Sequence, residues 1–220
     1  MANRKYDYIF WDFDGTVMDT YPGVTEAIQV GLEAYGIHED RPEVLRSFLG
    51  PPFRVCLPET YGIDMELTEK IVAVYRSYYQ EEAMYKGDMF PGVKEAAAAF
   101  RGAGFKQYIT TSKPKVMCEG IISKKGWDGI FDGVFGASLD GRIDTKIQVL
   151  NEAFRVLNIS GRSRVVLIGD TKYDADGAGE AGIDCIGITY GFGTREELKE
   201  HGATAIFDDL SEVVSCLIGE

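Results

Sequence analysis

Histidine is scarce and CxxC pairs are absent in this chain of 220 residues. It has two histidines, His38 and His201. Its four cysteines lie far apart and form no CxxC pair: Cys56, Cys118, Cys185 and Cys216. A zinc site and a Cys/His nucleophile are therefore not expected. We expect the cysteines to be reduced thiols, most of them in apolar surroundings.

The chain is also poor in positive charge and has no long apolar run. It carries 35 acidic against 23 basic residues, a formal net charge of -12. This acidity argues against a nucleic-acid polymer or an anionic membrane as the main partner. No apolar run is long enough to span a bilayer, and residues 1–6 are short and polar with no signal-peptide core, so we expect a cytoplasmic protein. A small anionic substrate stays possible, because a metal ion and a few lysines can reverse the local field.

Two different periodicities divide the chain. Between Thr20 and Lys86 apolar residues recur at helical spacing and no strand pattern appears. Helices are predicted there at 24–35, 44–49, 53–61 and 67–85. Gly and Pro separate these segments, as at the Gly50-Pro51-Pro52-Phe53 step. The stretch is therefore predicted to be a small all-helical bundle inserted after the first strand.

The remainder of the chain alternates between short apolar strands and helices. Strands are predicted at 6–11, 105–111, 133–137, 164–168, 185–189 and 205–207. Helices are predicted at 93–101, 115–125, 147–157, 175–181, 196–201 and 211–217. This alternation predicts an α/β fold in which helices cover both faces of a parallel sheet.

Polar residues follow three of the predicted strands. The first strand ends in the sequence Asp12-Phe13-Asp14-Gly15-Thr16, the second in Thr111-Ser112-Lys113, and a later one in Gly169-Asp170 with Asp174 four residues on. Lys146 stands at the start of a predicted helix. Because ligands of open α/β sheets bind beyond the carboxyl ends of the strands, these groups are expected to converge at one edge.

The four aspartates would crowd negative charge at that edge: Asp12, Asp14, Asp170 and Asp174. Carboxylates in contact are unfavourable unless a cation joins them or a proton is shared. Hard oxygen ligands suit Mg²⁺, and the motifs contain no soft ligand for zinc or copper. The sequence therefore predicts a magnesium site.

Groups that bind phosphate accompany the aspartates. Candidates are the amides near Gly15, the hydroxyl groups and the ammonium groups: Thr111, Ser112, Lys113 and Lys146. Carboxylates, a magnesium ion, lysines and exposed amides together describe a phosphoryl-transfer site.

These motifs and their order resemble the haloacid dehalogenase superfamily: DFDGT at 12–16, TSK at 111–113, Lys146, and GDxxxD at 169–174. The resemblance covers nearly the whole chain. It implies a Rossmann-like doubly wound core of residues 1–18 and 88–220, with a helical cap domain at 19–87. The Asp19-Thr20 pair, the Gly50–Phe53 step and the Tyr190-Gly191-Phe192-Gly193 loop resemble the phosphoglycolate phosphatase branch. The Thr-Ser-Lys-Pro run and the Gly50–Phe53 step also resemble bacterial 5'-nucleotidase-like members.

The resemblance implies a role for each site residue. Asp12 attacks phosphorus and forms an aspartyl-phosphate, and Asp14 protonates the leaving alcohol and then activates water. Asp12, the Asp14 carbonyl and Asp170 hold magnesium, while Asp174 supports the metal or orients a lysine. The groups that bind the phosphoryl oxygens are Thr111 and Lys146. The cap closes over the site and chooses the leaving group.

The implied substrate is a small phosphorylated metabolite, with phosphoglycolate first and a nucleoside monophosphate as the alternative. Less favoured are a dehalogenase, which has little use for magnesium, and a phosphosugar mutase, against which the cap segments of the phosphatase branch weigh. A catalytically silent scaffold is also less favoured, because it would be expected to lose Asp12, Asp14 or a metal residue, and all are present. Simpler structural roles stay open for individual residues: Asp174 or Thr111 as helix caps, and Lys113 as a surface lysine. The oligomeric state stays open as well.

Overall fold

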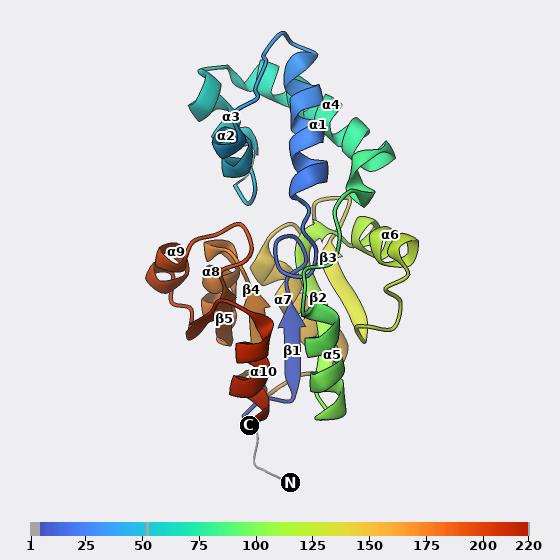
Figure 1. Ribbon diagram of the computed structural model, residues 1–220, viewed down its shortest axis with the longest axis vertical. Helices are drawn as coiled ribbons and strands as arrows, with labels where there is room; N and C mark the ends of the chain where they lie inside the picture. The colour runs from blue at the N-terminus through green and yellow to red at the C-terminus, as the bar shows by residue number, and fades with distance from the viewer. Residues whose placement is uncertain (1–4, 52, 220) are drawn as a thin grey trace. The chain divides into compact units, whose positions relative to one another are not determined.

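The computed structural model describes residues 5–51 and 53–219 (Figure 1). Pro52, which belongs to the Gly50–Phe53 step, lies outside the described residues. So do residues 1–4, which belong to the polar segment at the start of the chain. The chain divides into two compact units. One, called the core unit here, comprises Met1–Asp19 and Met89–Glu220, and the other, the helical unit, comprises Thr20–Asp88. Within the described ranges, no helix combines the length and apolarity needed to cross a membrane.

The core unit is built on a six-stranded sheet in which every pair of neighbours runs parallel. The strands in chain order are β1 (Tyr8–Trp11), β2 (Lys106–Pro114), β3 (Gly133–Ala137), β4 (Val165–Gly169), β5 (Asp184–Ile188) and β6 (Ala205–Phe207). Their spatial order is β3-β2-β1-β4-β5-β6. The chain winds one way from β1 to β3 and the other way from β4 to β6, which confirms the predicted doubly wound α/β fold.

Helices cover both faces of this sheet (Figure 1). They are α5 (Val93–Gly102), α6 (Lys115–Lys125), α7 (Lys146–Leu157), α8 (Lys172–Ala181), α9 (Arg195–Glu200) and α10 (Leu210–Ile218), with a 3₁₀ turn at Arg162–Arg164. Side chains of β1 alternate between the two faces. Phe10 packs with Leu150 and Phe154 of α7, whereas the Trp11 ring lies 6.0 Å from the Phe100 ring of α5. The buried first strand is thus the centre of the core.

Local signals explain where several helices begin. Thr145 and Thr194 cap α7 and α9, each with a reciprocal bond from the residue at the third helical position. Helix α8 begins at Lys172, three residues before the predicted start, because Thr171 and Asp174 form such a capping box there. Strand β2 runs to Pro114, beyond its predicted end at Thr111, with a register shift against β3 between these two residues.

The helical unit contains α1 (Tyr21–Glu33), α2 (Pro42–Ser47), α3 (Phe53–Tyr61), α4 (Met65–Glu81) and a 3₁₀ turn at Ala83–Tyr85. All are helical, as the periodicity predicted. The apolar faces of these helices share a core whose buried members are Ile28, Leu32, Leu45, Phe48, Cys56, Leu57, Ile71 and Val72. Burial of these side chains supplies the free energy that short helices lack in isolation.

A buried carboxylate holds the connection between α1 and α2. Glu39 is only 3% exposed. It accepts hydrogen bonds from the backbone N–H of Arg41 at 3.0 Å, the Arg41 guanidinium at 2.8 and 2.6 Å, and the Tyr61 hydroxyl at 3.0 Å. These bonds, those from the Arg41 side chain foremost, lower the pKa of Glu39 to about 2. The ionised form of Glu39 therefore stabilises the folded state.

Glu39→Gln is expected to lower the free energy of unfolding of the helical unit by about 1–2 kcal/mol near neutral pH, since it replaces charge-assisted bonds with neutral ones. The native pKa lies below the unfolded value, so this contribution is present above about pH 4.5 and is lost as the pH falls through about 2. Urea denaturation near pH 7 and near pH 3 measures the effect, with the exposed Glu59→Gln as control. A difference between wild type and Glu39→Gln that grows toward acid pH would contradict this account.

Candidate active site

Two strands that meet at the switch point of the sheet carry the first site residues. Strands β1 and β4 are direct neighbours, and the chain winds away from them in opposite directions. Asp12 follows β1, and its backbone N–H donates to the Ile168 carbonyl of β4 at 2.9 Å. Asp170 directly follows β4, which ends at Gly169. The pairing of the two strands therefore places both aspartates side by side at the carboxyl edge.

A tight loop after β1 turns the chain back toward β4. The Gly15 N–H donates to the Met18 carbonyl at 2.9 Å, and the N–H groups of Val17 and Met18 both donate to the Phe13 carbonyl. Gly15 has φ +86°, and a Cβ on it would lie 2.2 Å from Oδ2 of Asp170. Only glycine satisfies both conditions.

Three carboxylates and one ammonium group form the centre of the site. Asp12, Asp170 and Asp174 each offer an oxygen, and these oxygens lie within 4.8 Å of one another. Nζ of Lys146 lies 2.5 Å from Oδ1 of Asp12, 2.7 Å from Oδ1 of Asp174 and 2.9 Å from the Thr110 carbonyl. All four side chains are buried. One buried positive charge thus faces three groups that are negative when ionised.

The pKa values of this cluster are displaced in the directions that burial demands. Burial raises the pKa of Asp12 to about 7, with Lys146 opposing the rise and Asp174 adding to it. Burial, reinforced by Asp174 and Asp12, raises the pKa of Asp170. Burial alone would lower the pKa of Lys146, but Asp12 and Asp174 outweigh it and the pKa is raised. The lysine is therefore protonated and the carboxylates lack a full counter-charge.

This excess of buried oxygen donors fits a divalent cation. The cluster holds three hard carboxylate ligands and no sulfur or imidazole donor. Such a set suits Mg²⁺ and is poor for zinc or copper. A cation there would supply the missing positive charge and lower the cost of ionising Asp12 and Asp170. Of the four predicted metal residues, Asp14 alone keeps its carboxylate outside this group of three.

The Asp14 carboxylate contacts Lys113 instead. Nζ of Lys113 lies 2.8 and 3.1 Å from the two Asp14 oxygens. The Asp14 side chain is 29% exposed, whereas the Lys113 side chain is only 7% exposed. Lys113 is therefore not a surface lysine, and its ammonium group neutralises the carboxylate nearest in sequence to Asp12.

The residues after β2 take different positions. Thr111 is buried, and its hydroxyl accepts from the Lys113 N–H at 3.1 Å. It does not cap the following helix α6, because Pro114 holds the cap position. Ser112 is exposed. The strand end thus contributes a buried hydroxyl, an exposed one and the lysine that contacts Asp14.

The two helices that begin at this edge position the central ion pair. Lys146 is the first residue of α7. Asp174 lies in the first turn of α8, where Oδ2 accepts from the N–H and hydroxyl of Thr171 while Oδ1 contacts Lys146. It therefore acts as a helix cap and as a site residue at once. Gly177 of α8 leaves room for the lysine, since a Cβ there would lie 2.5 Å from Cγ of Lys146.

Sequence reasoning did not assign the residues that hold Asp170. Oδ1 of Asp170 accepts from the Thr16 hydroxyl at 2.8 Å, and Oδ2 accepts from the Phe192 N–H at 2.7 Å. Thr16 was seen only as part of the DFDGT motif, and Phe192 only as part of a loop shared with one branch of a family. The two glycines that flank Phe192 were the available signal, because close backbone approach needs glycine.

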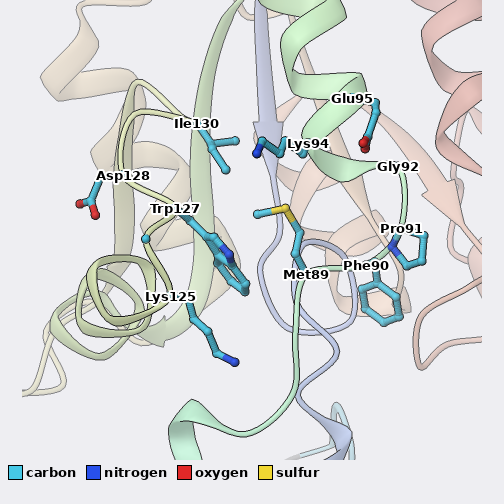
Figure 2. Close-up of a pocket in the computed structure, with 11 residues that line it drawn as sticks. Met89, Phe90, Pro91, Gly92, Lys94, Glu95, Lys125, Trp127, Asp128 and Ile130 are labelled. Carbon is cyan, nitrogen blue, oxygen red and sulfur yellow. The ribbon is translucent and has the colours of Figure 1, made fainter.

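Two further basic residues have partners away from this cluster. Lys172 contacts Glu197 at 3.1 Å, and Arg54 of the helical unit contacts Glu69. A separate cavity of about 690 Å³ lies in the core unit, beside the start of α5 and the end of α6, and Figure 2 shows its lining residues. Its described lining residues include Phe90, Lys94 and Trp127 and none of the predicted site residues.

Comparison with known proteins identifies the family. The family model described as haloacid dehalogenase-like hydrolase matches residues 9–188. This chain belongs to that family. The match spans β1 to β5 and hence every residue of the carboxylate cluster.

Several relatives of this hydrolase carry nucleotidase or phosphatase names. It is 33% identical over 210 residues to a 5'-nucleotidase of Pseudomonas aeruginosa, covering 96% of this chain and 95% of the relative. It is 24% identical over 225 residues to a phosphoglycolate phosphatase of Colwellia psychrerythraea, covering 99% of each. A solved structure titled as a predicted phosphatase from Clostridium acetobutylicum matches with TM-score 0.89 and 32% identity, covering 98% of this chain and 99% of that one. The hydrolase is thus a phosphatase of this family.

Mg²⁺ is expected to stabilise the hydrolase more at about pH 8 than at about pH 5. The pKa of Asp12 in the folded protein is about 7, above its ordinary value of 3.8. Without metal, the protonated Asp12 therefore stabilises the folded state below about pH 4, and this stabilisation is lost as the pH rises through about 7. A cation takes the place of the proton, and its benefit therefore grows over the same range.

Melting temperatures with Mg²⁺ and with EDTA, measured across that pH range, test this expectation. The quantity compared is the shift in Tm caused by Mg²⁺ at each pH, which removes the pH dependence of groups far from the cation site. Asp12→Asn is the control: it removes one of the titrating carboxyls and should reduce the dependence, while Asp170, whose pKa is also raised, retains part of it. An equal shift at both ends of the range would contradict the assignment of Asp12 to a cation site.

Proposed function

We propose that this chain is a magnesium-dependent phosphomonoester hydrolase that acts on a small phosphorylated metabolite through an aspartyl-phosphate at Asp12. One observation carries the proposal. Asp12 lies at the switch point of the sheet, 2.5 Å from the Lys146 ammonium group and in one cluster with Asp170 and Asp174. A carboxylate between a lysine and a candidate cation site can approach an anionic phosphate without prohibitive repulsion.

In the first half-reaction Asp12 is the nucleophile. Lys146 holds one Asp12 oxygen, and the other oxygen attacks phosphorus as the bond from phosphorus to the alcohol oxygen breaks. Asp14, two residues further along the loop, gives its proton to the departing alcohol oxygen. Lys146 and the Thr111 hydroxyl bind phosphoryl oxygens in this proposal, and the charge of Lys146 stabilises the negative charge of the transferring group.

In the second half-reaction water releases the phosphate. Asp14, now a carboxylate, takes a proton from a water molecule whose oxygen forms the new bond to phosphorus. The bond between phosphorus and the Asp12 oxygen breaks, which frees inorganic phosphate and restores the Asp12 carboxylate. The contact of Asp14 with Lys113 at 2.8 Å orients the Asp14 carboxylate for this step.

Asp12, the Asp14 carbonyl and Asp170 would hold the magnesium ion, which would neutralise charge on the nucleophile and on the phosphoryl group. Asp174 supports the site through Lys146, which it contacts at 2.7 Å. The cluster of buried carboxylates also favours this reaction over dehalogenation, which has little use for a metal ion. It favours an enzyme over a silent scaffold as well, because a scaffold would not need such a cluster.

Asp12→Asn is expected to lower kcat for a generic aryl phosphate by about three orders of magnitude or more, because the amide cannot form the covalent intermediate. EDTA should abolish the wild-type rate and excess Mg²⁺ should restore it. The matched control is Asp40→Asn, an exposed aspartate of the helical unit. Full activity in EDTA would refute the metal requirement, and normal turnover by Asp12→Asn would refute the nucleophile.

A second experiment addresses the substrate. A relative named 5'-nucleotidase is 33% identical to this chain, and the phosphoglycolate phosphatase of Colwellia psychrerythraea is 24% identical. The relatives therefore favour a nucleoside 5'-monophosphate over phosphoglycolate, which the sequence resemblance put first. We expect kcat/KM to be about tenfold or more higher for nucleoside monophosphates, a difference of about 1.4 kcal/mol in transition-state binding. A preference for phosphoglycolate in the same assay would reverse the assignment.

A further inference from the structure

The loop after β5 folds over the Asp170 carboxylate. It contains the sequence Tyr190-Gly191-Phe192-Gly193. The Phe192 N–H donates to Oδ2 of Asp170 at 2.7 Å. A Cβ on Gly191 would lie 2.3 Å from that same oxygen and 2.4 Å from the Gly15 carbonyl oxygen, and a Cβ on Gly193 would lie 2.2 Å from the Asp170 carbonyl oxygen. The two glycines therefore let this backbone reach the aspartate closely enough for the bond to form.

Tyr190 connects this loop to the loop that carries Asp12 and Asp14. Its hydroxyl donates to the Thr16 carbonyl at 2.8 Å. The hydroxyl of the same Thr16 donates to Oδ1 of Asp170 at 2.8 Å. Tyr190, Thr16 and Asp170 thus form a chain of two hydrogen bonds, and the Phe192 N–H closes it on the other carboxylate oxygen.

The ring of Tyr190 is fixed by a second contact. It lies 4.8 Å from the Phe90 ring, and the Phe90 N–H donates to the Val17 carbonyl at 3.0 Å. Met18 and Met89 form an antiparallel bridge beside this contact. Phe90, which packs on the Tyr190 ring, is thus bonded to Val17, the neighbour of the Thr16 whose carbonyl accepts from the Tyr190 hydroxyl. These contacts limit where the hydroxyl can lie.

We propose that Tyr190 is a positioning residue that sets the Asp170 carboxylate for cation binding by fixing Thr16. The inference rests on the proposed function, in which Asp170 is a magnesium ligand. Each Asp170 oxygen already accepts one bond from a fixed donor, so its rotation is restricted and its remaining lone pairs have set directions. Groups that orient a metal ligand in this way typically change metal affinity about 10- to 100-fold when they are removed.

Tyr190→Phe removes the hydroxyl and keeps the ring that packs on Phe90. We expect it to weaken Mg²⁺ binding to the substrate-free protein about 3- to 10-fold, measured by isothermal titration calorimetry. The control is Tyr35→Phe, which removes the hydroxyl of an exposed tyrosine of the helical unit. A merely structural role for Tyr190 would lower the melting temperature and leave the Mg²⁺ dissociation constant unchanged, and that result would overturn the proposal.

Thr16 gives an independent test of the same chain of bonds. Thr16→Val removes its hydroxyl at nearly constant volume and should weaken Mg²⁺ binding about 10-fold or more, whereas Thr16→Ser keeps the hydroxyl and should bind nearly as wild type. Because Tyr190 acts through Thr16, the double variant Tyr190→Phe/Thr16→Val should bind little worse than Thr16→Val alone. Effects that multiply fully in the double variant would show that Tyr190 acts by another route.

The same titrations separate this proposal from the proposed function. A wild-type protein that binds no Mg²⁺ would overturn the metal assignment, and with it the role of Tyr190. A wild-type protein that binds Mg²⁺ while Tyr190→Phe binds it equally well would overturn the role of Tyr190 alone. Loss of Mg²⁺ affinity in Tyr190→Phe and Thr16→Val, with near wild-type affinity in Thr16→Ser, would support both.

Discussion

The burial of three carboxylates around a single ammonium group is the constraint on which this site depends. Asp12, Asp170 and Asp174 are each buried, and among the described side chains Lys146 pairs with two of them, Asp12 and Asp174. Such a cluster is unfavourable without further positive charge, because like charges repel strongly at low dielectric. The same burial raises the pKa of Asp12 to about 7, and the three oxygens lie close enough together to fit a divalent cation.

The parallel sheet makes this arrangement possible. Strands β1 and β4 lie side by side where the winding reverses, so the loops after them must leave the sheet at one point. Close backbone approach there requires glycine, as at Gly15 and Gly191, where any Cβ would strike the Asp170 carboxylate. Rigid strands thus fix the aspartates, while loops and helix starts supply the donors and the lysine that complete the site.

Much of this organisation follows from local patterns. The limits of α3, α6, β3 and β6 agree with the predicted ranges, because Gly or Pro breaks lie near clear apolar periodicity. The start of α8 was missed because Asp174 has two tasks: its carboxylate caps the helix and also contacts Lys146. The end of β2 was missed because the strand continues through an irregular register beside β3, which no periodicity reveals.

Patterns along the chain predicted a parallel α/β sheet, the helical insertion and the residue types that gather at the sheet edge, because these depend on periodicity and on motifs at strand ends. The doubly wound core was expected from the family resemblance. The pairing of these residues becomes apparent only in the folded chain. Lys146 meets Asp12 across 134 positions, Thr16 meets Asp170 across 154 and Tyr190 meets Thr16 across 174. Lys113 contacts Asp14, and Glu39 is buried. Neither could be predicted from spacing along the chain, because burial and pairing arise from contacts between distant segments.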